Sequence, residues 1–336
     1  MRSDSRVAVI GAGISGLTFA RELNEKFDIT VFEKANRPGG RVTSKVINGA
    51  DFDYGAQFFT AKTASFKTLI NDMQSEGVVD DWQGHFIEFD HTTICSQRPW
   101  DDEYPHYVGV PNMSAMMHWM AEPLNIHYHS NITRIEREAE VWHLYNGDAE
   151  LGQFDWVILT MPPEQVCELL SEKHVFYQQL ATIKMQACFA LRVVLNGEVD
   201  LDFNAALVRN HDVSWISKNS SKPERSGAPC IIVQSTNNWA DEHLNDDLQK
   251  VEQHMLGCLN DITGLRQSAI ASSDVKKWVF ANAPRQSGSD YLLDSDGGIA
   301  ICGDGLVHGR IESAFTSAQQ LANAVLKDLN VVQNKV

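Results

Sequence analysis

Residues 7–33 read VAVIGAGISGLTFARELNEKFDITVFE, and this stretch decides the fold of the chain. An apolar strand is followed by the pattern Gly11-x-Gly13-x-x-Gly16, a helix, and a second strand that ends at Glu33. The glycines permit a tight turn and let backbone amides approach a pyrophosphate, while the carboxylate can bond the adenosine ribose. The stretch predicts a dinucleotide-binding unit, for which NAD and FAD both fit. The alternative is a glycine-rich turn between core elements.

Length and charge narrow the classes of partner. At 336 residues the chain exceeds the size at which one core usually stops growing, so two closely joined domains are expected. Lys and Arg total 28 against 44 Asp and Glu, a formal net charge of −16. This charge repels phosphate backbones and anionic lipid surfaces. We therefore predict no nucleic-acid partner and no membrane partner; the sequence leaves the oligomeric state open.

The cysteines indicate a reducing compartment. No two of the six form a CxxC pair, so neither a disulfide framework nor a redox dithiol is expected. The apolar stretch near the start holds the glycine pattern and is not read as a signal peptide, and no run of 18 apolar residues occurs. A cytoplasmic protein without a membrane span is predicted.

A second glycine-rich segment, KANRPGGR at 34–41, bears on the choice between NAD and FAD. A glycine pair followed by Arg41 supplies a close backbone approach and a fixed cation. That combination suits a longer ligand whose pyrophosphate needs charge compensation. The alternative interpretation is a polar surface turn.

The end of the chain favours FAD. Residues 298–329 read as an apolar strand, a Gly-Asp-Gly turn and a long amphipathic helix. The helix has one apolar stripe at helical spacing, formed by Ile311, Ala314, Phe315, Ala318, Leu321, Ala322, Val325, Leu326 and Leu329. At the start of the helix, Asp304 is placed to accept hydrogen bonds from ribityl hydroxyls, and the amides of 310–312 to face the flavin pyrimidine. An NAD enzyme has no such requirement.

Together these segments resemble the FAD-dependent amine oxidase superfamily. A narrower resemblance to the bacterial renalases rests on GAQFFTA at 55–61, YVGVPNMSA at 107–115, WISKNSSKP at 215–223, NWADEHL at 238–244 and KWVFA at 277–281. Two positions depart from that pattern: Glu224 stands where relatives tend to have Gly, and Asn112 stands where Gly is usual.

The resemblance implies an α/β fold: a Rossmann-type, glutathione-reductase-like FAD domain and an α+β substrate domain on a mixed sheet. The FAD domain is predicted at 1–62, 108–162 and 289–332, and the substrate domain at 63–107 and 163–288. Strands are predicted at 126–129, 132–135, 141–145, 156–160, 186–195 and 230–235, a helix at 244–259, and an exposed loop at 218–229.

FAD is expected to be non-covalent, because no Cys lies in a setting like the covalent attachment site of monoamine oxidases. Ile132 is expected to present its backbone to the adenine, as the equivalent position does in the family. The full set of predicted cofactor contacts is Gly11, Ala12, Gly13, Ser15, Gly16, Glu33, Lys34, Gly40, Arg41, Ala56, Gln57, Phe58, Ile132, Gly303, Asp304 and Ile311.

Renalases oxidise mis-reduced isomers of NAD(P)H, pass a hydride to flavin N5, and return it to O₂ as hydrogen peroxide. The resemblance implies this activity here, with a dinucleotide and O₂ as the small-molecule partners. A dihydropyridine donates hydride directly, so no catalytic side chain is expected. No metal site is predicted, since His127 and His129 have no third ligand at useful spacing.

Candidate substrate contacts are aromatic, polar and cationic: Gln57, Phe58, Phe59, Thr60, Arg98, Lys184, His243, Trp278 and Arg310. Core packing is the alternative for the aromatic residues, and surface solvation for Arg98 and Lys184. Two other functions remain open: an amine oxidase, in which Lys184 would lie near N5, and a flavin-holding redox sensor without turnover.

Overall fold

A computed structural model describes residues 5–100 and 105–333, and for 328–333 the backbone alone. By internal contacts the chain divides into two compact units. The first unit comprises Met1–Gly40, Met117–Met185 and Ala283–Val336, and the second Arg41–Met116 and Gln186–Asn282.

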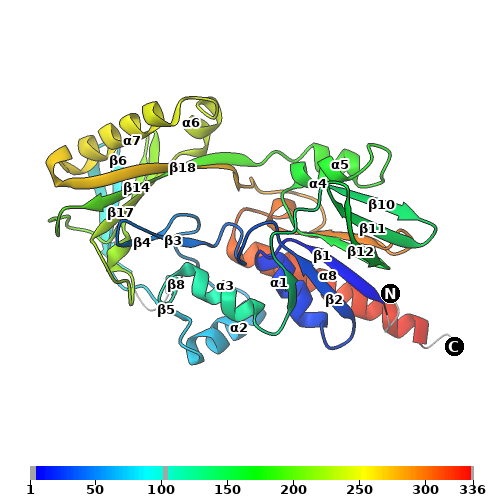
Figure 1. The fold of residues 1–336 in the computed structure, drawn as a ribbon. Helices are drawn as coiled ribbons and strands as arrows, with labels where there is room; N and C mark the ends of the chain where they lie inside the picture. Colours follow the sequence, from blue (N-terminus) through cyan, green and yellow to red (C-terminus); the bar gives the residue numbers. More distant parts are fainter. Residues whose placement is uncertain (1–4, 101–104, 334–336) are drawn as a thin grey trace. The chain divides into compact units, whose positions relative to one another are not determined.

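The first unit is built on a six-stranded sheet (Figure 1). Its order is β9 (Asn125–His127), β2 (Asp28–Phe32), β1 (Arg6–Ile10), β13 (Trp156–Leu159), β20 (Ile299–Cys302), β19 (Tyr291–Asp294). All neighbours are parallel except β19 and β20, which are antiparallel. Strands β13 and β20 are buried at every residue, as expected of parallel strands covered on both faces. The predicted Rossmann-type sheet is confirmed.

Helices and a small sheet cover the two faces of this sheet. In Figure 1, α1 (Ile14–Leu23) and α8 (Ile311–Gln333) lie on one side, and β10 (Arg134–Glu138), β11 (Val141–Asn146) and β12 (Ala149–Phe154) on the other. α4 (Pro163–Leu169) and α5 (Tyr177–Ala181) also contribute: Val166 and Leu180 share a core cluster with Ile10 and Leu144. This packing explains why 163–185 belong to the first unit.

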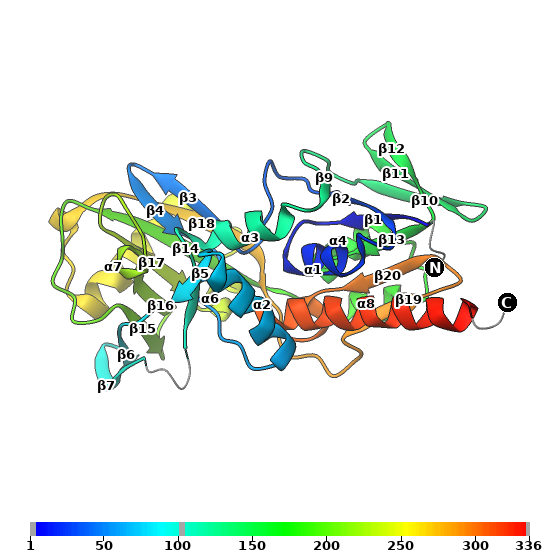
Figure 2. The ribbon, with the colours of Figure 1, turned by 90° about the horizontal axis from the view of Figure 1, so that it is seen from below.

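The apolar stripe of α8 is buried from Ala314 to Val325, whereas Ile311 and Leu326 are half-buried and the side chain of Leu329 lies outside the described residues. The helix follows the Gly-Asp-Gly turn and begins at Ile311, the first residue of the predicted stripe. Asp304 lies before it in a separate 3₁₀ turn, η3 (Asp304–Leu306). Figure 2 shows α8 running along β19 and β20.

The second unit is built on a seven-stranded mixed sheet. Its order is β18 (Ile270–Asn282), β14 (Gln186–Leu195), β17 (Cys230–Ser235), β16 (Val213–Lys218), β15 (Ala205–Arg209), β6 (His85–Asp90), β7 (Thr93–Pro99). Only β15 and β6 pair in parallel. Strands β14 and β17 have the bounds that their apolar runs predict.

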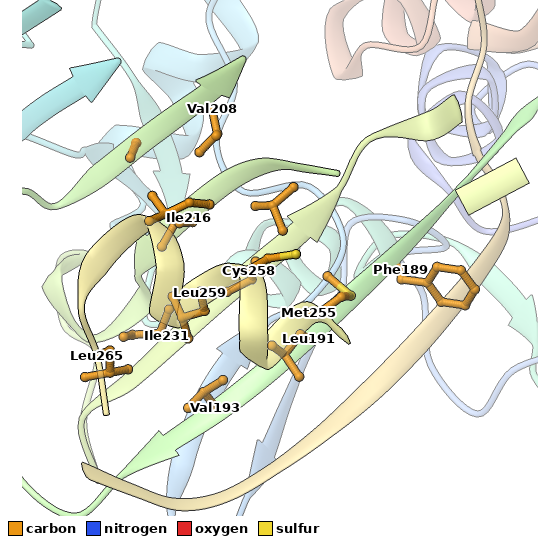
Figure 3. Packing of buried hydrophobic residues seen from close by; sticks show 14 of the residues in the cluster. Phe189, Leu191, Val193, Val208, Ile216, Ile231, Met255, Cys258, Leu259 and Leu265 are labelled. Carbon is orange, nitrogen blue, oxygen red and sulfur yellow. The ribbon is translucent and has the colours of Figure 1, made fainter. Parts of the chain in front are cut away.

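Helix α7 (Leu248–Thr263) packs its apolar face on this sheet (Figure 3). The sequence predicted a start at Leu244. The helix begins later because the Asp247 carboxylate accepts hydrogen bonds from the N–H groups of Gln249 and Lys250, which caps the first turn. The short helix α6 (Asn237–Glu242) precedes it.

Shorter elements complete the second unit: the pairs β3 (Ser44–Ile47) with β4 (Ala50–Asp53) and β5 (Val79–Asp81) with β8 (Tyr107–Gly109), the helix α2 (Ala64–Ser75), and the 3₁₀ turns η1 (Asn219–Ser221) and η2 (Gln267–Ala269). The division between the units runs through α3 (Met113–Ala121).

This division differs from the predicted domain boundaries, which assigned 41–62 to the FAD domain. Ala50 and Phe52 of β4 pack against Val194 and Ile232 of the second unit. Within the ranges that the structure describes, no helix is long and apolar enough to span a bilayer.

Candidate cofactor site and a neighbouring polar network

The three glycines of the fingerprint have different local roles. A Cβ on Gly16 would lie 1.9 Å from the carbonyl oxygen of Gly11, so α1 could not pack on the turn. Gly11 has φ +109°, and its Cβ would lie 2.7 Å from Oγ1 of Thr160. A Cβ on Gly13 would meet nothing within 4 Å. Gly11 and Gly16 therefore shape the turn, whereas Gly13 keeps the space at the helix N-terminus open.

Glu33 holds the fingerprint turn with both carboxylate oxygens. Oε2 accepts from the N–H of Ala12 at 2.9 Å, and Oε1 accepts from the N–H of Ala35 at 2.8 Å. The residue is 7% exposed. Each carboxylate oxygen has a second lone pair, so both can still accept hydroxyl hydrogens. Lys34, the next residue, is exposed.

The glycine pair at 39–40 brings its loop onto the fingerprint. The N–H of Gly39 donates to the carbonyl of Ala12 at 2.8 Å. Gly40 has φ +57°, and a Cβ there would lie 3.6 Å from Cα of Gly13. Arg41 and Ala56 belong to the second unit, where the N–H of Ala56 donates to the carbonyl of Arg41 at 3.0 Å.

Residues near the end of the chain join the same site. Oγ of Ser15 donates to the carbonyl of Ala314 in α8 at 3.0 Å, and the N–H of Gly303 donates to Oγ of Ser317 at 2.8 Å. Asp304 is 6% exposed. The structure therefore brings Ser15, Gly303 and the first turns of α8 together; that these residues bind one cofactor stays a prediction.

The donor set fits the ADP half of FAD. Helix α1 has no side-chain cap at Gly13, so the N–H groups of its first turn are open to an anion. Gly13 leaves room for a pyrophosphate, and Glu33 offers acceptors for ribose hydroxyls. Ile132 is buried against Phe32, the residue before Glu33.

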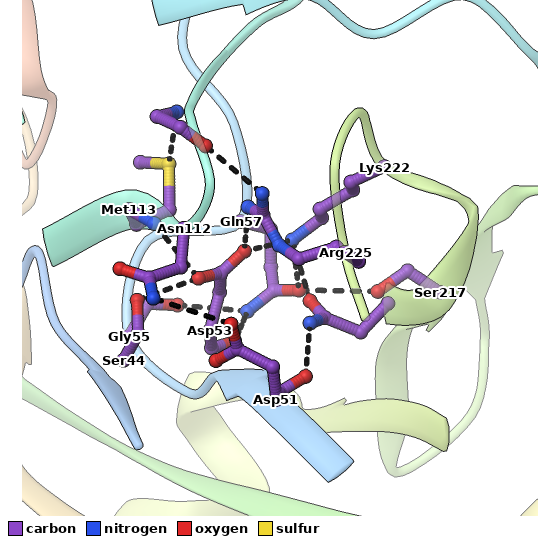
Figure 4. A network of polar contacts seen from close by, with 12 residues as sticks. Ser44, Asp51, Asp53, Gly55, Gln57, Asn112, Met113, Ser217, Lys222 and Arg225 are labelled. Atoms are coloured by element: carbon purple, nitrogen blue, oxygen red, sulfur yellow. Dashed lines mark hydrogen bonds and ion pairs between the residues drawn. The ribbon is translucent and has the colours of Figure 1, made fainter. Parts of the chain in front are cut away.

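In the second unit, Gln57 is committed to a polar network (Figure 4). Its Nε2 donates to the carbonyls of Asp53 and Gly55, and its Oε1 accepts from Oγ of Ser217 at 3.1 Å and from Nζ of Lys222 at 3.4 Å. The amide therefore fixes the 53–57 turn.

At the centre of the network Asp53 is paired with two cations. Its Oδ2 lies 3.1 Å from Nζ of Lys222 and also accepts from Arg225, while its Oδ1 accepts from Oγ of Ser44 at 2.6 Å and from the N–H of Met113 at 2.9 Å. The side chains of Asp53 and Lys222 are fully buried.

The two partners of this ion pair titrate differently from exposed groups. Burial by itself raises the pKa of the Asp53 carboxyl, but the attraction of Lys222 and Arg225 and the Ser44 hydrogen bond lower that pKa below its usual value. Burial lowers the pKa of the Lys222 ammonium to about 8, against the opposing attraction of Asp53.

The prediction of an exposed loop at 218–229 is wrong for its first part, although Glu224, Ser226 and Gly227 are exposed. Asn219 and Lys222 are buried, at 0% and 3% exposure, because they hold β4 from across the chain. Sequence reasoning missed this network. Lys222 and Asp53 are 169 positions apart, so no local pattern connects them.

The aromatic substrate candidates divide into packed and half-exposed residues. Phe59 is 5% exposed and packs on Phe66 and Tyr107, so it belongs to the core. Phe58 is half-buried beside Trp215, with ring centroids 5.2 Å apart. Trp278 is half-buried and donates from Nε1 to the carbonyl of Tyr54 at 2.9 Å. Thr60 is also half-buried.

The remaining candidates are not gathered in one place within the second unit. Arg98 lies on β7 and Trp278 on β18, the two edge strands of the seven-stranded sheet. Nδ1 of His243 lies 2.8 Å from Oδ2 of Asp246. In the first unit, Lys184 and Arg310 are both exposed.

Sequence reasoning also missed Arg285 and His308, which lie near Arg310 in the first unit. The N–H of Gly309 donates to the carbonyl of Ala283 at 2.9 Å, and the N–H of Gln286 donates to that of Val307 at 2.8 Å, so segment 283–286 runs beside 307–310. Burial and the charges of Arg310 and Arg285 together lower the pKa of His308. Two arginines, Arg285 and Arg310, therefore lie at this edge of the first unit, with Asp304 as an opposing charge on His308.

Comparison with known proteins agrees with this arrangement. Residues 9–72 match a model described as an NAD(P)-binding Rossmann-like domain, and residues 90–326 match one described as flavin-containing amine oxidoreductase. Renalase of Mus musculus is 21% identical over 94% of this chain and 96% of its own length.

Two further relatives are informative about the N-terminal region and the fold. Protoporphyrinogen oxidase 2 of Arabidopsis thaliana is 40% identical, but over only 21% of this chain and 14% of its own. The structure of cyclohexylamine oxidase from Brevibacterium oxydans IH-35A superimposes with a TM-score of 0.73 at 14% identity, covering 97% of this chain and all of that one.

Proposed function

Because this chain belongs to the flavin-containing amine oxidoreductase family, we propose that it is a renalase-like oxidase that takes a hydride from 2- or 6-dihydro isomers of NAD(P)H. The observation that carries the proposal is the likeness to renalase, which extends along nearly the whole of both chains. The likeness to protoporphyrinogen oxidase 2, in contrast, covers about a fifth of this chain.

The cofactor is non-covalent FAD, held at its ADP half by the fingerprint turn, Glu33 and the loop at Gly39 and Gly40. When bound, FAD supplies N5 as hydride acceptor and passes the electron pair to O₂, giving hydrogen peroxide.

For this reaction the protein has to orient the substrate and does not have to provide a catalytic base. A dihydropyridine becomes aromatic by losing a hydride alone, so no side chain has to remove a proton first. In the second unit the buried Lys222 and Asp53 are paired with one another, and Gln57 is held by Ser217 and Lys222. These groups keep the 53–57 turn in one conformation, against which a planar substrate can be oriented.

The phosphates of a dinucleotide need cations on a protein of net charge −16. Arg310 and Arg285 lie on neighbouring segments of the first unit, and both bear electrostatically on His308. We propose that these two arginines bind the substrate phosphates; Arg310 was a candidate from the sequence, and Arg285 is added by the structure.

Amine oxidation is the second candidate, because the family is named for it and Lys184 is exposed in the first unit. Peroxide formation in air separates the two. The holoenzyme is supplied with purified 2- and 6-dihydro isomers of NADH and NADPH, with ordinary 4-dihydro NADH as the matched control, and with a panel of primary amines. The proposal predicts peroxide from the isomers alone. Peroxide from amines and none from the isomers would overturn it.

A further inference from the structure

Three side chains with the donor atoms of a zinc site meet in the second unit. Nε2 of His254 lies 2.8 Å from Oδ2 of Asp212 and 3.5 Å from Sγ of Cys258. All three donor atoms lie within 4.8 Å of one another. His254 and Cys258 are one turn apart on α7, and Asp212 comes from the connection between β15 and β16.

The spacing of the imidazole nitrogen and the thiol sulfur matches that of a tetrahedral site, whereas the carboxylate of Asp212 has to move to complete it. With Zn–N near 2.0 Å and Zn–S near 2.3 Å, the nitrogen and sulfur of two ligands lie about 3.5 Å apart, which is the separation found here. Nitrogen and carboxylate oxygen require about 3.4 Å. The carboxylate of Asp212 therefore has to withdraw by about 0.6 Å, a small movement for an exposed side chain.

Neighbouring residues hold the side chains of His254 and Cys258 in place and add a negative charge near the three donor atoms. The indole of Trp239 stacks on the imidazole of His254, with centroids 4.8 Å apart and planes 10° from parallel. Asp261, one turn beyond Cys258, adds a negative charge that acts on the Cys258 thiol. Cys258 is 5% exposed and belongs to the core cluster under α7, which holds its side chain in place (Figure 3).

An ion can also reach the site. The side chains of His254 and Asp212 are 43% and 46% exposed, which leaves room for water as a fourth ligand. Imidazole nitrogen, thiolate sulfur and carboxylate oxygen together are the donor set of Zn²⁺ and, as a probe, of Co²⁺.

We propose that Asp212, His254 and Cys258 bind one Zn²⁺ per chain, with water in the fourth position. Binding expels the thiol proton of Cys258 to solvent and leaves the imidazole neutral, with its proton on Nδ1. The ion ties α7 to the β15–β16 connection. The proposed role of the ion is to hold these two elements of the second unit together.

Titration of the FAD-loaded protein with Co²⁺ tests the proposal, after removal of any affinity tag and dialysis against a chelator. One Co²⁺ per chain should bind and give the absorption of a tetrahedral thiolate complex at longer wavelengths than the flavin. Zn²⁺ should displace it and raise the thermal midpoint of the holoenzyme.

Variants show whether these residues are the ligands. Asp212→Asn and His254→Gln alter exposed side chains, so both should fold, and each should weaken binding by more than the roughly 10- to 100-fold that outer-shell changes cost. Cys258→Ser should abolish the thiolate absorption. His143→Gln is the matched control, because it removes a histidine–carboxylate pair of the same 2.8 Å length in the first unit, and it should bind as the parent does. The proposal would be overturned if the parent did not bind one Co²⁺ per chain. It would also be overturned if Asp212→Asn and His254→Gln bound Co²⁺ as tightly as the parent does.

Discussion

The carboxylate of Glu33 accepts a hydrogen bond from the backbone N–H of Ala12 at 2.9 Å, across 21 positions of sequence. This contact joins the end of β2 to the turn between the two outer glycines of the fingerprint. Glu33 therefore has two tasks: it orients the turn that faces the pyrophosphate, and it offers acceptors to the adenosine ribose.

Glu33→Gln should weaken FAD binding without unfolding the first unit. The amide keeps one acceptor oxygen, but its NH₂ group would face the N–H of Ala12 or of Ala35. Loss of a charge-assisted hydrogen bond costs about 1.5–3 kcal/mol, so the Kd for FAD should rise about 10- to 100-fold. Fluorescence titration of the apoprotein measures this, with the exposed Glu25→Gln as control. An unchanged Kd in Glu33→Gln would show that the carboxylate does not act on the cofactor.

Alanine at two of the fingerprint glycines should have opposite consequences. Gly16→Ala places a Cβ 1.9 Å from the Gly11 carbonyl, so the chain should misfold or lose α1 packing. Gly13→Ala meets no protein atom within 4 Å, so the variant should fold with the parental thermal midpoint as apoprotein. It should nevertheless fail to retain FAD through purification, because the Cβ occupies the pyrophosphate space. A yellow Gly13→Ala protein would contradict the account of the site.

The buried pair in the second unit should respond asymmetrically to substitution. Asp53→Asn leaves Lys222 and Arg225 buried side by side without their anion, and removal of one partner of a buried ion pair costs about 3–5 kcal/mol. Lys222→Met leaves Asp53 paired with Arg225, so its loss should be smaller. Chemical denaturation of the holoenzymes gives both free energies of unfolding. Equal losses would mean that Arg225 does not neutralise Asp53.

The same pair sets a pH dependence of stability. The pKa of Asp53 is lower folded than unfolded, so its stabilisation is present above about pH 4 and disappears as the pH falls through the lowered value. The pKa of Lys222 is about 8 when folded, against the ordinary lysine value of 10.5. Between these values the unfolded chain binds more protons, so this residue's contribution to the free energy of unfolding rises with pH. Lys222→Met should lose that rise, and identical alkaline profiles would contradict it.

Arg310→Ala should keep its flavin but lose affinity for a dinucleotide substrate. A phosphate contact worth about 1.4 kcal/mol corresponds to a tenfold increase in KM, and the difference from the parent should shrink as salt is added. Arg285→Gln should behave in the same way. Lys173→Ala, an exposed cation of the same unit, serves as control. Steady-state kinetics at two ionic strengths would refute the assignment if KM did not change.

The sequence predicted the main elements of the first unit because each of its motifs is continuous in the chain. The strand, glycine turn, helix and acid of 7–33 form one continuous motif, and the stripe from Ala314 to Val325 has a helical period. The start of α7 was placed too early because an apolar residue, Leu244, precedes the Asp247 cap.

The second unit depends on long-range partners that no window of sequence contains. Lys222 lies in a polar segment that resembles a surface loop. Its charge is buried because it pairs with Asp53 at the end of β4, and β4 itself packs in the core of the second unit. Asp212 also has a distant partner, since it meets His254 across 42 positions. The one-turn spacing of His254 and Cys258 was the part of that cluster visible in the sequence.

We propose that this protein oxidises a dihydronicotinamide isomer. To test this, separate anaerobic samples of the holoenzyme are mixed with purified 6-dihydro NAD and with the purified 2-dihydro isomer. The flavin absorption of each sample is recorded. At least one isomer should bleach the flavin rapidly, with one NAD⁺ formed per flavin, whereas ordinary NADH should not bleach it on the same timescale. A flavin that stays oxidised with both isomers, or that bleaches only with an amine, would contradict the proposal.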